Sequence, residues 1–107
     1  MNNALIGQAT EEQIKQWKAK HGKVITFIQE DDKGQKHITY VRSPRLPEMQ
    51  NASRFIADDP IKSGLMLLND CRLGGSEVAM QTDEMKFGIS KKMPSLFKTV
   101  EAELGEA

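Results

Sequence analysis

The sequence predicts a small α+β domain in which an N-terminal helix and a β-hairpin are followed by three to four helices. Two observations carry this prediction. Two runs rich in β-branched and aromatic residues flank a polar turn that contains Gly34, which is typical of a hairpin. After Pro47, apolar residues recur at helical spacing. The 107 residues suffice for one domain, so we expect a single domain over residues 1–107, with flexible ends at 1–9 and 105–107.

The first element is a helix that begins after Thr10. Thr10 and Gln13 have the spacing of a capping box, in which each side chain bonds the main-chain N–H of the other residue. Gly22 can end the helix in a left-handed conformation. The apolar face is thin, with Ile14 and Trp17 at its centre, so this helix must pack on another element.

The hairpin strands are predicted over Lys23 to Gln29 and over His37 to Arg42. The first strand is apolar on both faces, with Ile25 and Phe27 on one and Val24 and Ile28 on the other. We therefore expect this strand to be covered on both sides or to face a partner.

Two helices should follow the hairpin. Pro47 suits the first turn of a helix that runs to about Ala57, and Asp59 caps a second helix from Pro60 to about Arg72. Glycines 74 and 75 are expected to end the second helix. Residues 76–82 alternate apolar and polar side chains, which permits a short strand.

The last part of the chain predicts an amphipathic helix. A helix capped by Asp83 precedes Pro94, which either kinks it or starts a new one. Over residues 94–104, apolar side chains recur at helical intervals. This stripe can close the core or bind a partner. We take as candidate partner-binding residues Leu96, Phe97, Val100 and Leu104.

Charge does not favour nucleic acid as a partner. Lys and Arg number 15 and Asp and Glu number 15, so the net charge is zero and no overall basic field exists. The stretches 15–23 and 86–98 each hold four lysines and no acid. They could contact phosphates only if the fold brought them together.

No pattern of residues predicts catalysis, a cofactor or a metal. The soft metal ligands are His21, His37 and Cys71, which are isolated, whereas structural zinc sites use four ligands in close pairs. Cys71 could act as a nucleophile with a histidine base, but only the adjacent Arg72 would favour a reactive thiol. We expect no catalytic residue, no cofactor and no metal.

Compartment signals are sparse. The longest apolar run, Leu65 to Leu68, is far shorter than the ~20 residues of a membrane span. A single cysteine allows no internal disulfide. We expect a cytoplasmic protein without a membrane partner.

Several short motifs carry a family resemblance. They are YVRSPR at 40–45, DPIK at 59–62, LLNDCRLGG at 67–75 and EAEL at 101–104, in the order hairpin, helix, helix, terminal helix. This order resembles small proteins of tailed phages and prophages, and it is similar to the tail assembly chaperone group.

The resemblance implies a non-enzymatic protein in the host cytoplasm whose partner is a phage tail component. Members of the group are thought to bind the tape-measure protein, a long apolar helical protein, while the tail tube forms. A homo-oligomer is compatible with this reading. Two alternative functions are a structural minor virion or tail protein and a small nucleic-acid-binding regulator.

Overall fold

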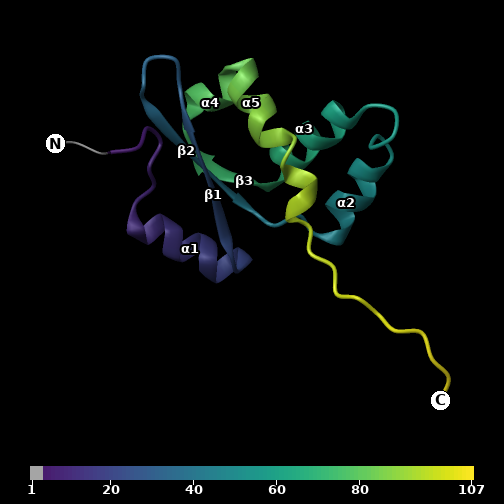
Figure 1. Cartoon of the computed structure of the whole chain (residues 1–107). Helices are drawn as coiled ribbons and strands as arrows, with labels where there is room; N and C mark the ends of the chain where they lie inside the picture. Colours follow the sequence, from purple (N-terminus) through teal and green to yellow (C-terminus); the bar gives the residue numbers. More distant parts are fainter. Residues whose placement is uncertain (1–3) are drawn as a thin grey trace.

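The structure is a computed structural model that describes residues 4–107. It confirms the α+β class: helices surround a three-stranded antiparallel sheet, and an N-terminal helix precedes the hairpin (Figure 1). The elements are α1 (Glu11–His21), β1 (Val24–Glu30), β2 (Lys36–Arg42), α2 (Leu46–Ser53), α3 (Pro60–Cys71), β3 (Arg72–Gly75), α4 (Glu77–Gln81), α5 (Asp83–Ser90) and a 3₁₀ turn η1 (Met93–Leu96).

The capping box at the start of α1 and the helix end at Gly22 confirm the sequence prediction, although Gly22 (φ 83°, ψ −123°) is not in the left-handed helical region. The Thr10 hydroxyl accepts the Gln13 N–H at 3.1 Å, and the Gln13 side chain accepts the Thr10 N–H at 3.0 Å. Gly22 then adopts φ 83° and donates its N–H to Lys18. These local bonds satisfy main-chain groups that a helix end leaves unpaired.

The sheet has the order β1-β2-β3, and every pairing is antiparallel. Strands β1 and β2 pair in register from Val24 opposite Arg42 to Glu30 opposite Lys36. Strand β3 pairs with a shorter part of β2, and a register shift interrupts the pairing between Tyr40 and Val41.

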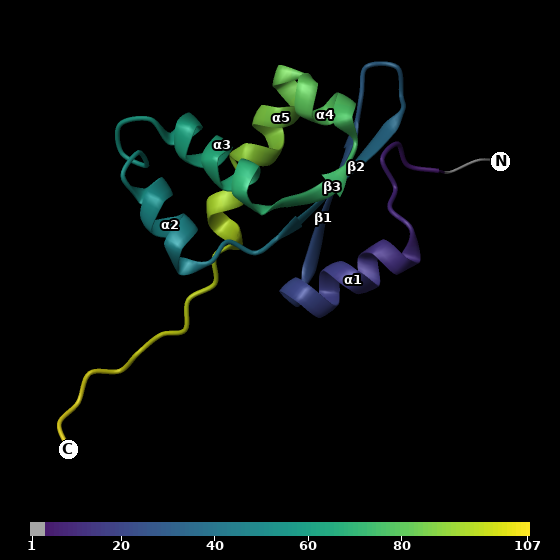
Figure 2. The same cartoon turned by 180° about the vertical axis from the view of Figure 1, so that it is seen from behind.

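Helices cover both faces of this sheet (Figures 1 and 2). Successive strand residues point to opposite faces, so Tyr40 and Val41 mark the two sides. Trp17 of α1 packs on Tyr40 with ring centroids 5.2 Å apart. Val41 joins the main core on the other face, whose fully buried members are Val41, Ala52, Leu67, Leu68, Cys71, Ile89 and Met93.

The prediction that Gly74 and Gly75 cap a helix is wrong. Helix α3 ends at Cys71, and the chain passes at once into β3, with Arg72 at φ −64° and ψ 130°. The glycines serve close packing instead. A side chain on Gly74 would meet the Trp17 ring, and one on Gly75 would collide with the Ile38 carbonyl. Non-local pairing with β2 therefore overrides the local capping signal.

Residues 76–82 form no strand, contrary to the alternation that permitted one. Ser76 caps the short helix α4, because its hydroxyl accepts the Ala79 N–H at 3.2 Å. The next helix, α5, begins at Asp83 with Thr82 as its cap residue, one position before the predicted cap. Helix α2 also ends earlier than predicted, at Ser53.

The predicted helix over residues 94–104 is the largest error. Only the turn η1, Met93–Leu96, forms there, and the chain from residue 97 onward has no regular structure (Figure 1).

The expected flexible N-terminus falls partly on residues 1–3, which lie outside the described residues. Beyond them, Ile6 is attached to β2. Its N–H donates to the Lys36 carbonyl at 2.9 Å, and its carbonyl accepts the Ile38 N–H at 3.0 Å. Residues 4–9 thus form an arm beside the sheet.

Candidate functional site

The candidate partner-binding residues lie where the chain leaves the folded body. We call residues 96–107 the C-terminal segment. Leu96 packs against the core, and Phe97 is half-buried. Val100 and Leu104 are fully exposed, at 94% and 103% of their reference areas. The structure therefore does not bring the four residues into one stripe: the first two are held by the fold and the last two are not.

Elementary helix energetics explain why the C-terminal segment is extended. Isolated helices shorter than about 12–15 residues are marginal in water even with favourable composition. Thr99 and Val100 are β-branched and Gly105 lies near the end, which lowers helix propensity at these three positions. No described residue packs against Val100 or Leu104 to compensate, since both are fully exposed.

The two lysine-rich stretches lie on different sides of the sheet. The stretch 15–23 includes most of α1, which covers the Tyr40 face. The stretch 86–98 includes the end of α5, whose Ile89 packs in the core on the Val41 face. The condition for a shared phosphate-binding surface is thus not met by these two stretches.

A hydrogen-bonded chain of Asp31, His37 and Ser76 joins the hairpin turn to the start of α4. The His37 Nε2 lies 2.9 Å from the Asp31 Oδ2, and its Nδ1 lies 2.8 Å from the Ser76 Oγ. A carboxylate only accepts hydrogen bonds, so in the neutral ring Nε2 carries the proton and Nδ1 accepts the Ser76 hydroxyl proton.

Burial decides what this Asp–His–Ser chain can do. Ser76 is 1% exposed and His37 is 2% exposed, and the Ser76 oxygen already accepts the Ala79 N–H. A nucleophilic hydroxyl needs access to its substrate, which this hydroxyl lacks. The arrangement instead satisfies buried polar groups and fastens the turn to the sheet.

The contacts of Asp31 with His37 and with the turn also lower the pKa of the Asp31 carboxyl. The hydrogen bond from His37 lowers the pKa of Asp31 below its ordinary value of 3.8, and the main-chain N–H groups of Gln35 and Lys33 contribute in the same direction. Both N–H groups donate to the Asp31 Oδ1 at 2.9 Å. Asp31 is therefore charged throughout the neutral range.

Cys71 lies in the core and is fully buried. Burial raises the pKa of its thiol to about 11, which keeps it protonated and unreactive near neutrality. Across residues 4–107, no three His, Cys, Asp or Glu side chains come close enough to hold a metal ion.

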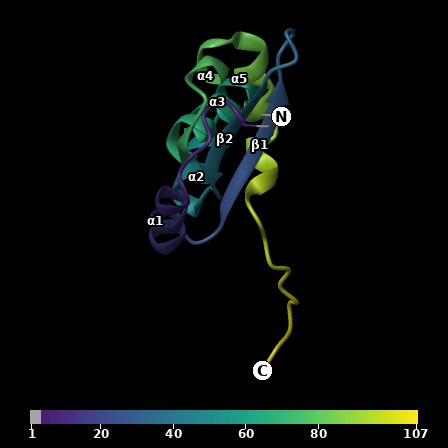
Figure 3. The same ribbon diagram turned by 90° about the vertical axis from the view of Figure 1, so that its left-hand side faces the viewer.

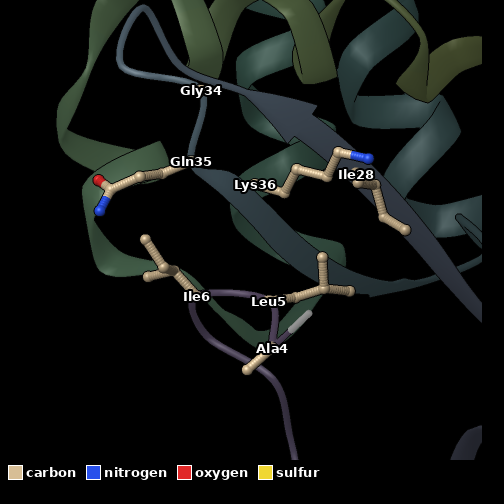
Figure 4. A pocket seen from close by; sticks show the side chains of 7 residues that line it. All are labelled: Ala4, Leu5, Ile6, Ile28, Gly34, Gln35 and Lys36. Carbon is tan, nitrogen blue, oxygen red and sulfur yellow. The ribbon is translucent and has the colours of Figure 1, made fainter. Parts of the chain in front are cut away.

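An open cavity of about 530 Å³ lies between the N-terminal arm and the hairpin (Figure 4). Leu5 and Ile6 enter it from the arm, Ile28 from β1, and Lys36 from β2. The exposed lining is about as polar as it is apolar, and the Lys36 ammonium is its charged group. Gln35 and Lys36 are the lining residues with polar side chains, so the cavity lacks the several convergent polar groups of a small-molecule site.

Sequence reasoning missed both the buried polar chain and this cavity. Ser76 and His37 are 39 positions apart, and no local pattern connects them. The arm was expected to be flexible, so nothing suggested that Ile6 would lie beside β2.

Comparison with known proteins adds no relative: the chain matches no family model, no curated protein and no solved structure. Within residues 4–107, every helix is too short or too polar to cross a lipid bilayer.

Proposed function

We propose that this chain is a non-enzymatic binding protein that assists phage tail assembly, holding a tape-measure-like tail protein through its C-terminal segment. The observation that carries the proposal is the exposure of Val100 and Leu104 on an extended chain. Their sequence spacing from Leu96 and Phe97 would place all four on one helical face.

The mechanism is folding on binding. Leu96 fixes the start of the C-terminal segment to the body, so a partner that presents an apolar helix surface needs to order only the residues beyond it. Covering Val100 and Leu104 contributes about 1.5–3 kcal/mol for each side chain, which offsets part of the ordering entropy. Glu101, Glu103 and Glu106 then favour a partner with basic residues beside its apolar surface.

The test is co-expression with a tape-measure protein from the same phage, followed by measurement of its soluble fraction and of its affinity for the purified chain. Val100→Asp should weaken binding roughly tenfold to a hundredfold, because a charge replaces an apolar contact. Ala102→Asp is the matched control: it adds the same charge to the opposite helical face and should bind nearly as the wild type does.

Both variants should have the same urea midpoint of unfolding as the wild type, since residues 100 and 102 are exposed. Equal binding by wild type and Val100→Asp would remove the C-terminal segment from the proposed site. A tape-measure protein that stays equally insoluble with and without the chain would remove the proposed function itself.

A further inference from the structure

The two edges of the sheet differ in how they are protected. The β3 edge is short, contains two glycines and is interrupted by a register shift against β2. Strand β1 is a regular seven-residue strand, VITFIQE, with no Pro, Gly or Lys in it. Edge strands in monomeric proteins usually carry such residues or a bulge, because a bare edge pairs with other strands. Figure 3 shows β1 as the outermost strand on its side of the sheet.

The direction of the main-chain groups on β1 follows from β2. Ile38 donates its N–H to Ile6, and its carbonyl accepts the Ser76 N–H, so both of its polar groups point away from β1. Its partner Ile28 must then point its own N–H and C=O away from β2. Because the direction of the main-chain groups alternates along a strand, the N–H and C=O groups of Val24, Thr26 and Glu30 also point away from β2. The sheet order places no strand beside them among the described residues.

The charges at the two ends of β1 are opposite. Lys23 immediately precedes the strand, whereas Glu30 ends it and Asp31 and Asp32 follow. A copy of the same strand laid antiparallel would bring the basic end of each strand to the acidic end of the other. A parallel neighbour would instead place like charges together, which is unfavourable.

We propose that β1 pairs antiparallel with β1 of a second copy of this chain, which joins the two sheets into one six-stranded sheet. In one register, the outward main-chain N–H and C=O groups of β1 all form hydrogen bonds with the second copy. In it the twofold axis passes beside Phe27, Thr26 lies opposite Ile28 of the second copy, and Val24 lies opposite Glu30.

The same register places favourable side-chain pairs across the axis. The two Phe27 rings become neighbours at a non-hydrogen-bonded position, where opposing side chains are closest. Ile28, which is 56% exposed in the single chain, lies against Thr26 of the second copy. Lys23 lies opposite Asp31. The second copy therefore covers the exposed Ile28 and the unpaired edge of β1, while Ile25 and Phe27 already pack against the core of their own chain.

The first experiment measures molar mass by light scattering and sedimentation from about 5 to about 500 μM, because the dimer population follows mass action. The wild type should move from 12.0 kDa toward twice that mass as concentration rises. Thr26→Pro should remain a monomer, since proline removes one outward N–H and leaves the β1–β2 ladder intact. Thr26→Ala keeps the N–H and should still dimerise.

A second pair of variants tests the charges. Lys23→Glu places like charges at both ends of the paired strands and should raise the dissociation constant several-fold. Lys15→Glu makes the same change on α1, away from the edge, and should leave the dissociation constant unchanged.

Amide hydrogen exchange on the wild type keeps the proposal testable if a variant fails to fold. The Thr26 and Ile28 amides should become protected as concentration rises, whereas a free edge exchanges at a rate independent of concentration. A wild type that stays monomeric at the highest concentration overturns the proposal. So does a dimer that survives Thr26→Pro, or one whose Thr26 and Ile28 amides stay unprotected. Val100→Asp should not alter dimerisation, so this result is independent of partner binding.

Discussion

At the scale of single residues, Ser76 connects three parts of the fold. Its main-chain N–H donates to the Ile38 carbonyl, its hydroxyl oxygen accepts the Ala79 N–H, and its hydroxyl donates to the Nδ1 of the neutral His37 ring. The side chain is buried, so water cannot replace these partners when they are lost. A single hydroxyl thus caps α4 and satisfies a buried histidine.

We predict that Ser76→Ala lowers the free energy of unfolding by about 1–3 kcal/mol, because it removes a helix cap and leaves the His37 Nδ1 without its donor. Urea denaturation followed by circular dichroism measures the change. Ser95→Ala is the control, since the Ser95 hydroxyl donates to Lys92 on the exposed surface. Equal stability of the Ser76→Ala variant and the wild type would contradict the assigned role.

At the scale of elements, helices α3 and α5 approach each other through Gly64. A Cβ atom at this position would overlap the Ser90 carbonyl, so the small residue permits the close contact between the two helices. Gly88 in α5 differs, because a Cβ there would meet only the flexible end of Gln29, at 3.1 Å. Both glycines lie within continuous helices, but a neighbouring backbone leaves no room for a side chain only at the first.

We predict that Gly64→Ala destabilises the protein by about 1–3 kcal/mol despite its higher helix propensity, because the backbone of α5 must move. Gly88→Ala should stay within about 1 kcal/mol of the wild type. Thermal and urea unfolding of the two variants provide the comparison. A stable Gly64→Ala variant would mean that α3 and α5 can separate without loss.

At the scale of the whole molecule, two carboxylates each bond a side chain six positions away in the sequence and so join neighbouring elements. Asp31 fastens the hairpin turn to His37, and Glu48 of α2 accepts a hydrogen bond from Arg42 of β2 at 2.7 Å. That bond from Arg42 lowers the pKa of Glu48 below its ordinary value of 4.5. A carboxyl whose pKa is lower in the folded state stabilises the fold above its unfolded-state pKa.

We therefore predict that stability falls in acid. The contribution of both carboxylates is complete above their ordinary values of 3.8 and 4.5 and is lost as the pH falls through their lower folded-state values. The urea midpoint measured between about pH 2 and 7 should decline over this range. Asp31→Asn and Glu48→Gln should each be less stable at neutral pH and show a shallower acid decline. If the urea midpoint of the wild type and of the variants declined equally steeply in acid, these two carboxylates would not control the acid loss of stability.

The local features of the fold were predictable because short-range chemistry determines them. The capping box at Thr10, the hairpin around Gly34 and the helix that starts after Asp59 each depend on residues a few positions apart. The candidate site was predictable only as a pattern. The helical spacing of Leu96 and Val100 is real in the sequence, but helix formation requires a surface that the fold does not supply there.

The sequence by itself determined the α+β class and the order of the first elements, because periodicity, caps and turn residues act locally. Tertiary structure decided that Gly74 and Gly75 form a strand, since the free edge of β2 gains hydrogen bonds from them. It also decided that His37 meets Ser76 and that Val100 and Leu104 remain in solvent. These outcomes depend on contacts between residues that are far apart in the sequence, or on the lack of such contacts, and a local sequence pattern cannot predict them.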